Sequence, residues 1–569
     1  MSLVDGVTAL IYDQTCAAEK RRRRKRGAFP DPVKRAFINP AVCEGCGDCG
    51  VKSNCVAIVP LETELGVKRA IDQSTCNKDF SCINGFCPSF VTVHGAVPKR
   101  SRGLAGASGL AAMLASLPEP KRPNLDKPYT MLVSGVGGTG VVTISAVLGQ
   151  AAHIDGKGFG AIDMAGLAQK GGAVACHMRI ARSSDDIHAI RAGVASADLI
   201  IGCDLVVTAS NKVLETVRPD HTAVIYSTHE MPVADFARQP DLRLPASDLR
   251  RSIEERVRKG PVHAMDANNY AVKLFGDSIA SNMFLLGYAY QLGYVPVSSG
   301  AIEQAIELNG AAIEMNSDAF RFGRLAAHDT GALERIVQPK PATSPTTVAD
   351  VVAFRANYLK AYQDEALARR FTGMVARFEA LEQAKAPGRK GLSEAVARGY
   401  FKLLSYKDEY EVARLYTDGR FEKAISENFD GDLKLEFHLA PPLMSWFSKD
   451  KVTGHPRKVS FGRWMLPVFR QLAKGRRLRG TKWDIFGYTG ERKLERKMIS
   501  DYEAVLAEIE RRLSPDTYHT AVGLARLPED IKGFGHVKLG NYEKVKQREA
   551  AMLADLRDPK PAPSLKAAE

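Results

Sequence analysis

Residues 129–152 read YTMLVSGVGGTGVVTISAVLGQAA, and this stretch decides the fold of the middle of the chain. It starts with a short apolar run, Tyr129–Ser134, of the kind that is buried in parallel sheets. A G-x-G-G-x-G loop follows at Gly135–Gly140, and an apolar helical pattern runs from Val141 to Ala152. A strand, a glycine-rich loop and a helix in this order predict the first part of an α/β domain.

Further apolar runs continue this pattern downstream. The expected strands lie at residues 159–163, 174–180, 198–203 and 222–227. Helical stretches separate most of them, so we predict a Rossmann-like α/β domain over residues 129–336.

The glycine loop has more than one interpretation. Its glycines are Gly135, Gly137, Gly138 and Gly140. They would bring helix amides toward an anion, and Asp163 follows at the spacing of the ribose-binding acid in a dinucleotide site. Glycines also simply permit a strand and a helix to pack closely. Because a single glycine pattern is weak, the ligand of the loop stays open.

Upstream of this domain, seven of the ten cysteines fall between residues 43 and 87. The first group reads CEGCGDCGVKSNC over residues 43–55. Its two-residue gaps let three thiolates converge on one iron–sulfur cluster, and the fourth ligand of such a cluster comes from a distant Cys-Pro, here Cys87-Pro88. In a large chain this clustering favours a metal site over disulfides.

The second cysteine group, CNKDFSCINGFCP over residues 76–88, repeats the spacing with Asp79 in place of the middle thiolate. Cluster one would take Cys43, Cys46, Cys49 and Cys87; cluster two would take Cys55, Cys76, Asp79 and Cys82. A carboxylate is a poor ligand for iron–sulfur, so cluster two has a [3Fe-4S] alternative. Zinc sites usually show two separated C-x2-C pairs, and we therefore expect two [4Fe-4S] clusters in a ferredoxin-like domain over residues 38–96.

The remaining cysteines are not expected to bind metal. Cys16 stands alone, and Cys176 and Cys203 lie in apolar strands, where they are expected to be small core residues. His177, beside Cys176, is expected to be structural.

The 569 residues carry a formal charge of +14, and this charge is local. Lys20–Arg26 reads KRRRRKR, and residues 449–497 hold a net charge of +11. The rest of the chain is close to neutral, unlike a nucleic-acid coat, so this composition does not favour nucleic-acid binding. No apolar stretch reaches membrane-spanning length and no leader is seen, so we expect a cytoplasmic protein without membrane contact.

The C-terminal third is expected to be a mainly helical accessory domain over residues 349–556. Linkers are expected at residues 97–128, with one short helix at 109–116, and at 337–348, and a disordered tail at 557–569. Trp446, Trp464 and Trp483 lie in or beside the basic segment 449–497. We favour core aromatics under a solvated basic face over a docking site for an acidic partner or CoA.

Two stretches resemble the gamma-type module of 2-oxoacid:ferredoxin oxidoreductases: VSGVGGTGVVT at 133–143 and GLAQKGGAVACHMRIA at 166–181. The GLAQKGG form and NMFLLG at 282–287 resemble the indolepyruvate (arylpyruvate) branch. Gly293, Pro296, Asn316 and Phe320 agree with that branch. The cysteine segment resembles its ferredoxin module, and residues 349–556 resemble the C-terminal domain of unknown function in large fused forms.

The resemblance implies a reaction. An arylpyruvate is decarboxylated on thiamine diphosphate and Mg, CoA takes the acyl group to give an aryl-acetyl-CoA, and electrons leave singly through iron–sulfur clusters to ferredoxin or flavodoxin. Lys170, Gly171 and Gly172 match a basic-Gly-Gly loop near the thiamine pocket of relatives and are expected to line that pocket. No catalytic residue is assigned.

A thiamine diphosphate motif of the G-D-G…N type is not found in the sequence. Residues 4–27 instead resemble the tail that closes the thiamine module, so residues 1–37 would be an orphan tail, with a strand at Val7–Tyr12, and a basic connector. We therefore expect the C-terminal half of the fused enzyme, as a split subunit or a truncated product, which works in an oligomer with a thiamine-binding partner chain. A non-catalytic iron–sulfur scaffold and a nucleotide-dependent iron–sulfur oxidoreductase are the alternatives.

Overall fold

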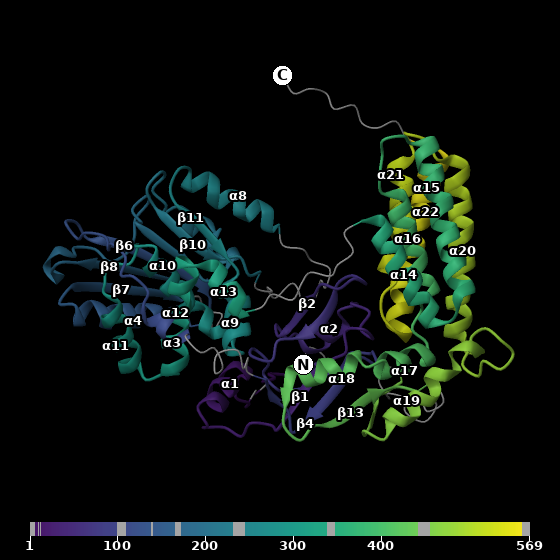
Figure 1. The fold of residues 1–569 in the computed structure, drawn as a ribbon, viewed down its shortest axis with the longest axis horizontal. Helices are drawn as coiled ribbons and strands as arrows, with labels where there is room; N and C mark the ends of the chain where they lie inside the picture. Colours follow the sequence, from purple (N-terminus) through teal and green to yellow (C-terminus); the bar gives the residue numbers. More distant parts are fainter. Residues whose placement is uncertain are drawn as a thin grey trace. The chain divides into compact units, whose positions relative to one another are not determined.

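The computed structural model describes residues 6–9, 11, 13–99, 110–137, 140–165, 172–230, 245–337, 347–441 and 456–559. The chain divides into two compact units, which are described separately (Figure 1). Unit 1 comprises Met1–Asp31, Asp72–Asn77 and Pro98–Pro341. Unit 2 comprises Pro32–Ile71, Lys78–Val97 and Ala342–Glu569.

A six-stranded sheet forms the centre of unit 1. Its strands are β6 (Tyr129–Val136), β7 (Gly158–Ala165), β8 (Ala173–Ala181), β9 (Leu199–Gly202), β10 (Ala223–Ser227) and β11 (Val262–Met265). The order across the sheet is β11-β10-β9-β6-β8-β7, with β11 to β6 parallel and β8 antiparallel to both β6 and β7. The five expected strands are all present. The sequence missed β11, a short strand at the sheet edge whose residues are half-buried or exposed and which therefore shows no apolar run.

Helices cover both faces of this sheet, as Figure 1 shows. One core contains α4 (Val141–Ile154), α9 (Ala267–Phe275), α10 (Ser281–Gln291), α11 (Ser299–Asn309), α12 (Ile313–His328) and α13 (Thr330–Val337). A smaller core on the other face contains α6 (Asn211–Leu214) and α8 (Ala246–Val257), and α5 (Leu205–Thr208) follows β9. Met131 and Leu132, neighbours in β6, lie in different cores, as the alternation of a strand requires.

Two glycines let α10 and α12 pack closely. A Cβ at Gly287 would lie 1.9 Å from the carbonyl oxygen of Phe320, and a Cβ at Gly323 would lie 1.9 Å from that of Phe284. Gly287 closes the NMFLLG motif, so this part of the motif has a packing role.

The cysteine segment of unit 2 has the element order β-α-β-β-3₁₀-β. The elements are β1 (Lys34–Ile38), α2 (Asp48–Ser53), β2 (Ile58–Leu61), β3 (Lys68–Ile71), η1 (Ser81–Asn84) and β4 (Phe90–His94). β1 pairs antiparallel with β4, with Phe37 opposite Val91, and β2 forms an antiparallel pair with β3. The chain ends of this segment are thus held together by one pair of strands.

The C-terminal part of unit 2 is mainly helical, as expected, but it also adds strands to the sheet of the cysteine segment. The helices are α14 (Val348–Tyr362), α15 (Glu365–Lys385), α16 (Leu392–Leu404), α17 (Glu409–Thr417), α18 (Arg420–Asn428), α19 (Met465–Lys474), α20 (Gly490–Arg512), α21 (Tyr518–Arg526) and α22 (Gly535–Arg557). Strands β13 (Lys434–Leu439) and β14 (Val459–Phe461) complete a sheet of order β1-β4-β13-β14. Phe37 and Leu435 lie on opposite sides of β4 in this sheet, opposite Val91 and Val93 respectively.

One hydrophobic core joins the two parts of unit 2. Val42, Val91 and Val93 of the cysteine segment are buried together with helix residues such as Tyr416 and Phe437 of β13. Within unit 2, the cysteine segment (Pro32–Ile71 and Lys78–Val97) and the helical part therefore share one hydrophobic core.

The N-terminal part of unit 1 is helical where the sequence suggested a connector. The basic run lies in α1 (Ala17–Lys25), and α3 (Leu110–Ala115) matches the expected short helix. No strand occurs in the described part of residues 6–14, where Val7 and Ile11 are exposed, so the expected strand at Val7–Tyr12 is not found there. Most of both linkers and the C-terminal tail from residue 560 lie outside the described residues. None of the described helices combines the length and apolar character needed to cross a membrane.

Candidate functional site

Unit 2 brings the predicted cluster-one cysteines into one buried region. Cys43 follows β1, Cys49 lies in α2 and Cys87 precedes β4, while Cys82 of η1 packs beside them. Cys43, Cys49 and Cys82 are each no more than 7% exposed. Burial raises the pKa of Cys49 well above its usual range, and the charges of Cys87, Cys43 and Cys46 raise it further.

Glycines between these cysteines are required by the backbone. Gly45 has φ +74°, and a Cβ there would lie 2.3 Å from the carbonyl oxygen of Val67. A Cβ at Gly85 would lie 2.8 Å from the Cα of Cys49. The close approach of backbone therefore explains Gly45 of the CEGCGDCG stretch and Gly85 of the CINGFC stretch.

The thiols are buried, and burial favours their protonated form, so metal ligation would be needed to keep them ionised. Burial, reinforced by the charge of Cys87, raises the pKa of Cys46 to about 12, and burial also raises the pKa of Cys87. Cys87 Sγ lies 2.9 Å from Ser89 Oγ, and the amide of Gly45 donates to Cys43 Sγ at 3.3 Å. Hydrogen bonds to sulfur are a known influence on iron–sulfur potentials.

An iron–sulfur cluster and a single metal ion require different arrangements of the donor side chains. Among the described residues, no three His, Cys, Asp or Glu side chains are grouped so that they surround one metal ion. A four-iron cluster makes a different demand, since each thiolate binds a different iron and the sulfurs stand farther apart. Cys43, Cys46, Cys49 and Cys87 would hold such a cluster.

Lysines from distant parts of the chain surround this region. Lys407 Nζ donates to the carbonyl oxygens of Val42 and Cys43, both at 3.1 Å, and Lys458 Nζ donates to that of Cys87 at 3.2 Å. Lys68 is 6% exposed, and burial together with the charge of Lys407 lowers the pKa of Lys68 to about 7. No sequence pattern points to these lysines, because two of them lie more than 360 positions away from the cysteine loops they contact.

The predicted cluster-two ligands are divided between the units. Cys55, Asp79 and Cys82 belong to unit 2, whereas Cys76 lies in the loop Asp72–Asn77 of unit 1. Asp79 is exposed, and its Oδ1 accepts hydrogen bonds from the amide and the hydroxyl of Ser81 at 3.2 and 3.1 Å. This local bond gives Asp79 a turn-forming role beside the predicted ligand role.

The basic helix α1 contacts the loop that carries Cys76. Arg21 donates to the carbonyl oxygen of Thr75 at 3.0 Å, and Arg24 donates to that of Asn77. The two residues that flank Cys76 are thus both held by arginines of the KRRRRKR run.

In unit 1 the glycine loop meets the basic-Gly-Gly loop. The amide of Gly137 donates to the carbonyl oxygen of Gly172 at 2.7 Å. Gly140, with φ +99°, precedes α4, and a Cβ there would lie 3.3 Å from Asn282 Nδ2 of the NMFLLG motif. Gly135 lies within β6, where a Cβ would lie 2.7 Å from Val141. The structure therefore brings three of the motifs together, while Gly138, Lys170 and Gly171 lie outside the described residues.

Asp163 does not take the position that a dinucleotide site requires. It lies on β7 at the edge of the sheet, and β8 separates β7 from β6. In a dinucleotide fold the ribose-binding acid ends the parallel strand next to the glycine-loop strand. Here the parallel neighbour of β6 is β9 instead.

The three other predicted residues of this domain are structural. Cys176 and Cys203 are buried, and burial strongly raises the pKa of each thiol. His177 is buried and its Nδ1 accepts from the amide of Ala192 at 3.2 Å.

The expected burial of the tryptophans is wrong for the two that the structure describes. Trp464 is 62% exposed and Trp483 is 78% exposed. The loop around Trp483 is nevertheless well anchored, because Asp484 is buried and accepts hydrogen bonds from Gly480 and Gly487. Trp446 lies outside the described residues.

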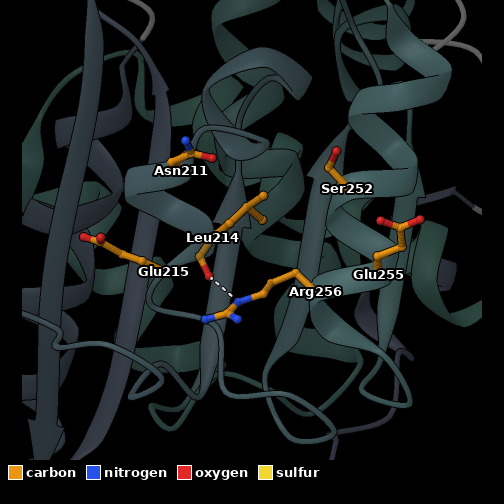
Figure 2. A pocket seen from close by; sticks show the side chains of 6 residues that line it. All are labelled: Asn211, Leu214, Glu215, Ser252, Glu255 and Arg256. Carbon is orange, nitrogen blue, oxygen red and sulfur yellow. Dashed lines mark hydrogen bonds between the residues drawn. The ribbon is translucent and has the colours of Figure 1, made fainter.

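An open hollow of about 510 Å³ lies between α6 and α8 of unit 1 (Figure 2). Its lining residues are Asn211, Leu214, Glu215, Ser252, Glu255 and Arg256. Arg256 spans it by donating to the carbonyl oxygen of Leu214 at 3.0 Å. None of the lining residues belongs to the cysteine groups or the glycine motifs, so we assign the hollow no part in the site.

Comparison with known families gives two matches, one to the α/β part of unit 1 and one to the helical part of unit 2. Residues 130–326 match the pyruvate ferredoxin/flavodoxin oxidoreductase family. Residues 348–551 match a family of unknown function, DUF6537. The first match covers the α/β sheet with its glycine motifs, and the second covers the helical part of unit 2.

Curated relatives of the first region share one description, indolepyruvate oxidoreductase subunit IorB. The protein from Methanothermobacter thermautotrophicus is 28% identical over 209 residues, which is 36% of this chain and 99% of the relative. The protein from Pyrococcus horikoshii is 26% identical over 211 residues, 36% of this chain and 98% of the relative. These matches confirm the resemblance to 2-oxoacid:ferredoxin oxidoreductases and support a gamma/IorB-type subunit.

Solved structures with similar chains have related descriptions. Pyruvate oxidoreductase subunit PORC from Thermotoga maritima is 22% identical, with a TM-score of 0.27, covering 35% of this chain and 96% of that chain. The gamma subunit of a keto/oxoacid ferredoxin oxidoreductase from Geobacter sulfurreducens is 21% identical, with a TM-score of 0.26, covering 35% of this chain and 98% of that chain.

Proposed function

We propose that this chain is the electron-transfer and gamma-module part of a thiamine-dependent enzyme that oxidises indolepyruvate or a related arylpyruvate. The observation that carries the proposal is the combination, in one chain, of a gamma/IorB-type domain and a buried group of cysteines with ferredoxin spacing. The overall reaction converts the 2-oxoacid, CoA and two oxidised ferredoxins into the acyl-CoA, CO₂, two reduced ferredoxins and one proton.

The residues of this chain would hold and shield the redox groups. Cys43, Cys46, Cys49 and Cys87 would bind one [4Fe-4S] cluster, and the second set with Asp79 would bind a second, [4Fe-4S] or [3Fe-4S], cluster. When bound, such clusters accept and release single electrons, which suits the stepwise oxidation of thiamine-bound intermediates. The β-α-β-β-3₁₀-β order of the segment supports a ferredoxin-like module.

Gamma-module residues would complete a pocket that another chain supplies with thiamine diphosphate and Mg. Gly137 and Gly172 hold the two glycine loops together, and Lys170 and Gly171 belong to the second loop. In this proposal these loops line the pocket, ferredoxin or flavodoxin accepts the electrons, and the clusters require a reducing compartment such as the cytoplasm.

The test is reconstitution under anaerobic conditions. The chain is mixed with a thiamine-binding chain of the same enzyme type and assayed for CO₂ and acyl-CoA with indolepyruvate, CoA and ferredoxin. We expect turnover only when both chains are present, and indolepyruvate to be used better than pyruvate or 2-oxoglutarate. Turnover by the thiamine-binding chain alone, unchanged on addition of this chain, would contradict the proposal.

A matched pair of variants separates electron transfer from assembly. Cys87→Ser should abolish reduction of ferredoxin, because it removes a predicted cluster-one ligand. Cys203→Ser, at a buried cysteine outside the cysteine groups, should keep the iron content of the parent. Equal activity of the two variants would count against cluster one as the electron path.

A further inference from the structure

The helical part of unit 2 makes direct contacts to the predicted cluster-one loops. Lys407, in the turn between α16 and α17, donates to the carbonyl oxygens of Val42 and Cys43. Lys458, just before β14, donates to the carbonyl oxygen of Cys87. Both ends of the predicted ligand set are therefore bound by a cation from residues that match a family of unknown function.

Neutral groups of the same segment fix the position of these loops. The hydroxyl of Tyr416 donates to the carbonyl oxygen of Pro88 at 2.6 Å, and the side-chain amide of Asn39 donates to that of Leu415 at 3.1 Å. Tyr416 and Leu415 both belong to α17. This helix and Lys407, which precedes it, therefore hold the cysteine loops in place together.

Buried lysines and carboxylates both lie around the thiols, with Asp48 acting on Lys458 and Glu411 on Lys407. Lys402 and Lys407 share the single carboxylate of Glu44, which is 8% exposed. The charges of Lys68 and Lys407 act on Cys43, and that of Lys458 acts on Cys87 and Cys49. Burying lysines is costly unless anions accompany them, and four thiolates with a cluster would add to the carboxylates already present.

We propose that residues 348–551 form the second wall of the iron–sulfur site and that Lys407 and Lys458 raise the reduction potential of the cluster held by Cys43, Cys46, Cys49 and Cys87. This inference rests on the proposed function only in requiring that cluster. A nearby cation stabilises the reduced, more negative form over the oxidised form, and low exposure to water strengthens the effect. Residues 348–551 of this chain then shield the cluster and control its electron transfer electrostatically.

The experiment measures iron content and the reduction potential, by EPR-monitored redox titration, of the full chain and of Lys407→Met and Lys458→Met. Methionine keeps the length and apolar body of the side chain and removes the charge. Lys423→Met, at a lysine 73% exposed on α18 of the same unit, is the matched control. We expect each site variant to shift the cluster-one potential negative by at least about 59 mV, a tenfold weaker reduction for one electron.

The outcomes separate this inference from the proposed function. Absence of iron from the parent chain would overturn the proposed function itself. Parental iron content with potentials that match Lys423→Met would overturn only the role of the lysines. If Lys407→Met loses iron, the test rests on Lys458→Met and on Lys407→Arg, which keeps the charge. A parental cluster-one potential in Lys407→Arg supports the proposal. Loss of iron in all three variants contradicts it.

Discussion

Asp79 stands where the cysteine spacing places a ligand, and its carboxylate already accepts two hydrogen bonds from Ser81. Because a thiolate binds iron more firmly than a carboxylate does, Asp79→Cys should raise the iron content of the isolated chain and stabilise the second cluster against oxygen. Iron analysis and EPR of aerobically and anaerobically handled samples would show this.

The control for Asp79→Cys is Asp126→Cys, which adds a thiol at an exposed aspartate outside the cysteine segment. Identical iron content and spectra in the parent chain and in both variants would argue against Asp79 as a ligand and leave it as a turn residue.

His438 gives unit 2 a predictable dependence on pH. It is buried on β13, its Nε2 lies 2.8 Å from Thr92 Oγ1, and burial lowers its pKa from 6.5 to about 4. Glu436 opposes this shift, whereas the positive charges of Lys458, His94 and Lys34 add to it. The unfolded chain takes up a proton below pH 6.5, and the folded chain does so only near pH 4.

The free energy of unfolding should therefore fall as the pH falls from about 6.5 to about 4, by at most about 3 kcal/mol from this group. Urea unfolding across this range would measure the slope for the parent and for His438→Gln, which should lose that part of it. Equal slopes in both proteins would show that another group is responsible.

At the residue level the sequence pattern singles out candidate donors but says little about their surroundings. Two-residue gaps place thiols on one loop whatever the rest of the fold does, so Cys43, Cys46 and Cys49 were recognisable. Lys407 and Lys458 were not, because only tertiary packing brings them to the cysteines. The favoured burial of Trp464 and Trp483 failed for a similar reason, since composition does not say which side of a helix or loop faces water.

Among the elements, β13 joins the helical part to the cysteine segment by pairing with β4. Phe437 of β13 is fully buried and packs against Tyr416 and Phe469, with ring centroids 5.1 and 5.4 Å apart. Phe437→Ala should lower the free energy of unfolding of unit 2 by about 3–5 kcal/mol, as measured by urea denaturation. Trp464→Ala, at an exposed site, should cost less than about 1 kcal/mol. Similar losses in both would mean that β13 is not part of a shared core.

The helix α1 gives the basic run a structural role. Because Arg21 and Arg24 donate to the carbonyl oxygens on either side of Cys76, changing both to Gln should loosen that loop by about 1 kcal/mol. Amide hydrogen exchange at Cys76 should then be roughly fivefold faster. Arg22 and Arg23, which pair with Glu19 instead, provide the control when both are changed to Gln. Equal exchange in the two double variants would show that α1 does not hold the loop.

The sequence predicted elements well where burial imposes a pattern. The five expected strands of the α/β sheet could be predicted, because each is apolar enough to be recognised alone. The edge strand β11 and the pair β13 and β14 were missed, since they are short and gain their stability from strands next to them. Their register depends on neighbours that are distant in the sequence.

For the whole molecule, the shared core of unit 2 predicts that the cysteine segment depends on the helical part. A chain that ends at residue 337 lacks β13, Lys407 and Tyr416, and should therefore fail to retain iron when it is purified anaerobically. Circular dichroism of the shortened chain should still show the α/β structure of unit 1. Full iron content in the shortened chain would establish the cysteine segment as an independent domain.

The charge of the molecule also has a structural account. The positive excess of the chain contributes to contacts with backbone carbonyl oxygens around the predicted ligands, from α1 in unit 1 and from Lys458 in unit 2. Both contacts lie in or near the two basic segments of the sequence, so part of this charge has an internal role besides any role at the surface.

The most direct measurement is iron and sulfide analysis of the anaerobically purified full chain, combined with EPR of the reduced protein. The account predicts about eight irons and eight inorganic sulfides for each chain and the signals of two [4Fe-4S] clusters. A chain that contains no iron, or that holds zinc in tetrahedral thiolate coordination, would contradict it.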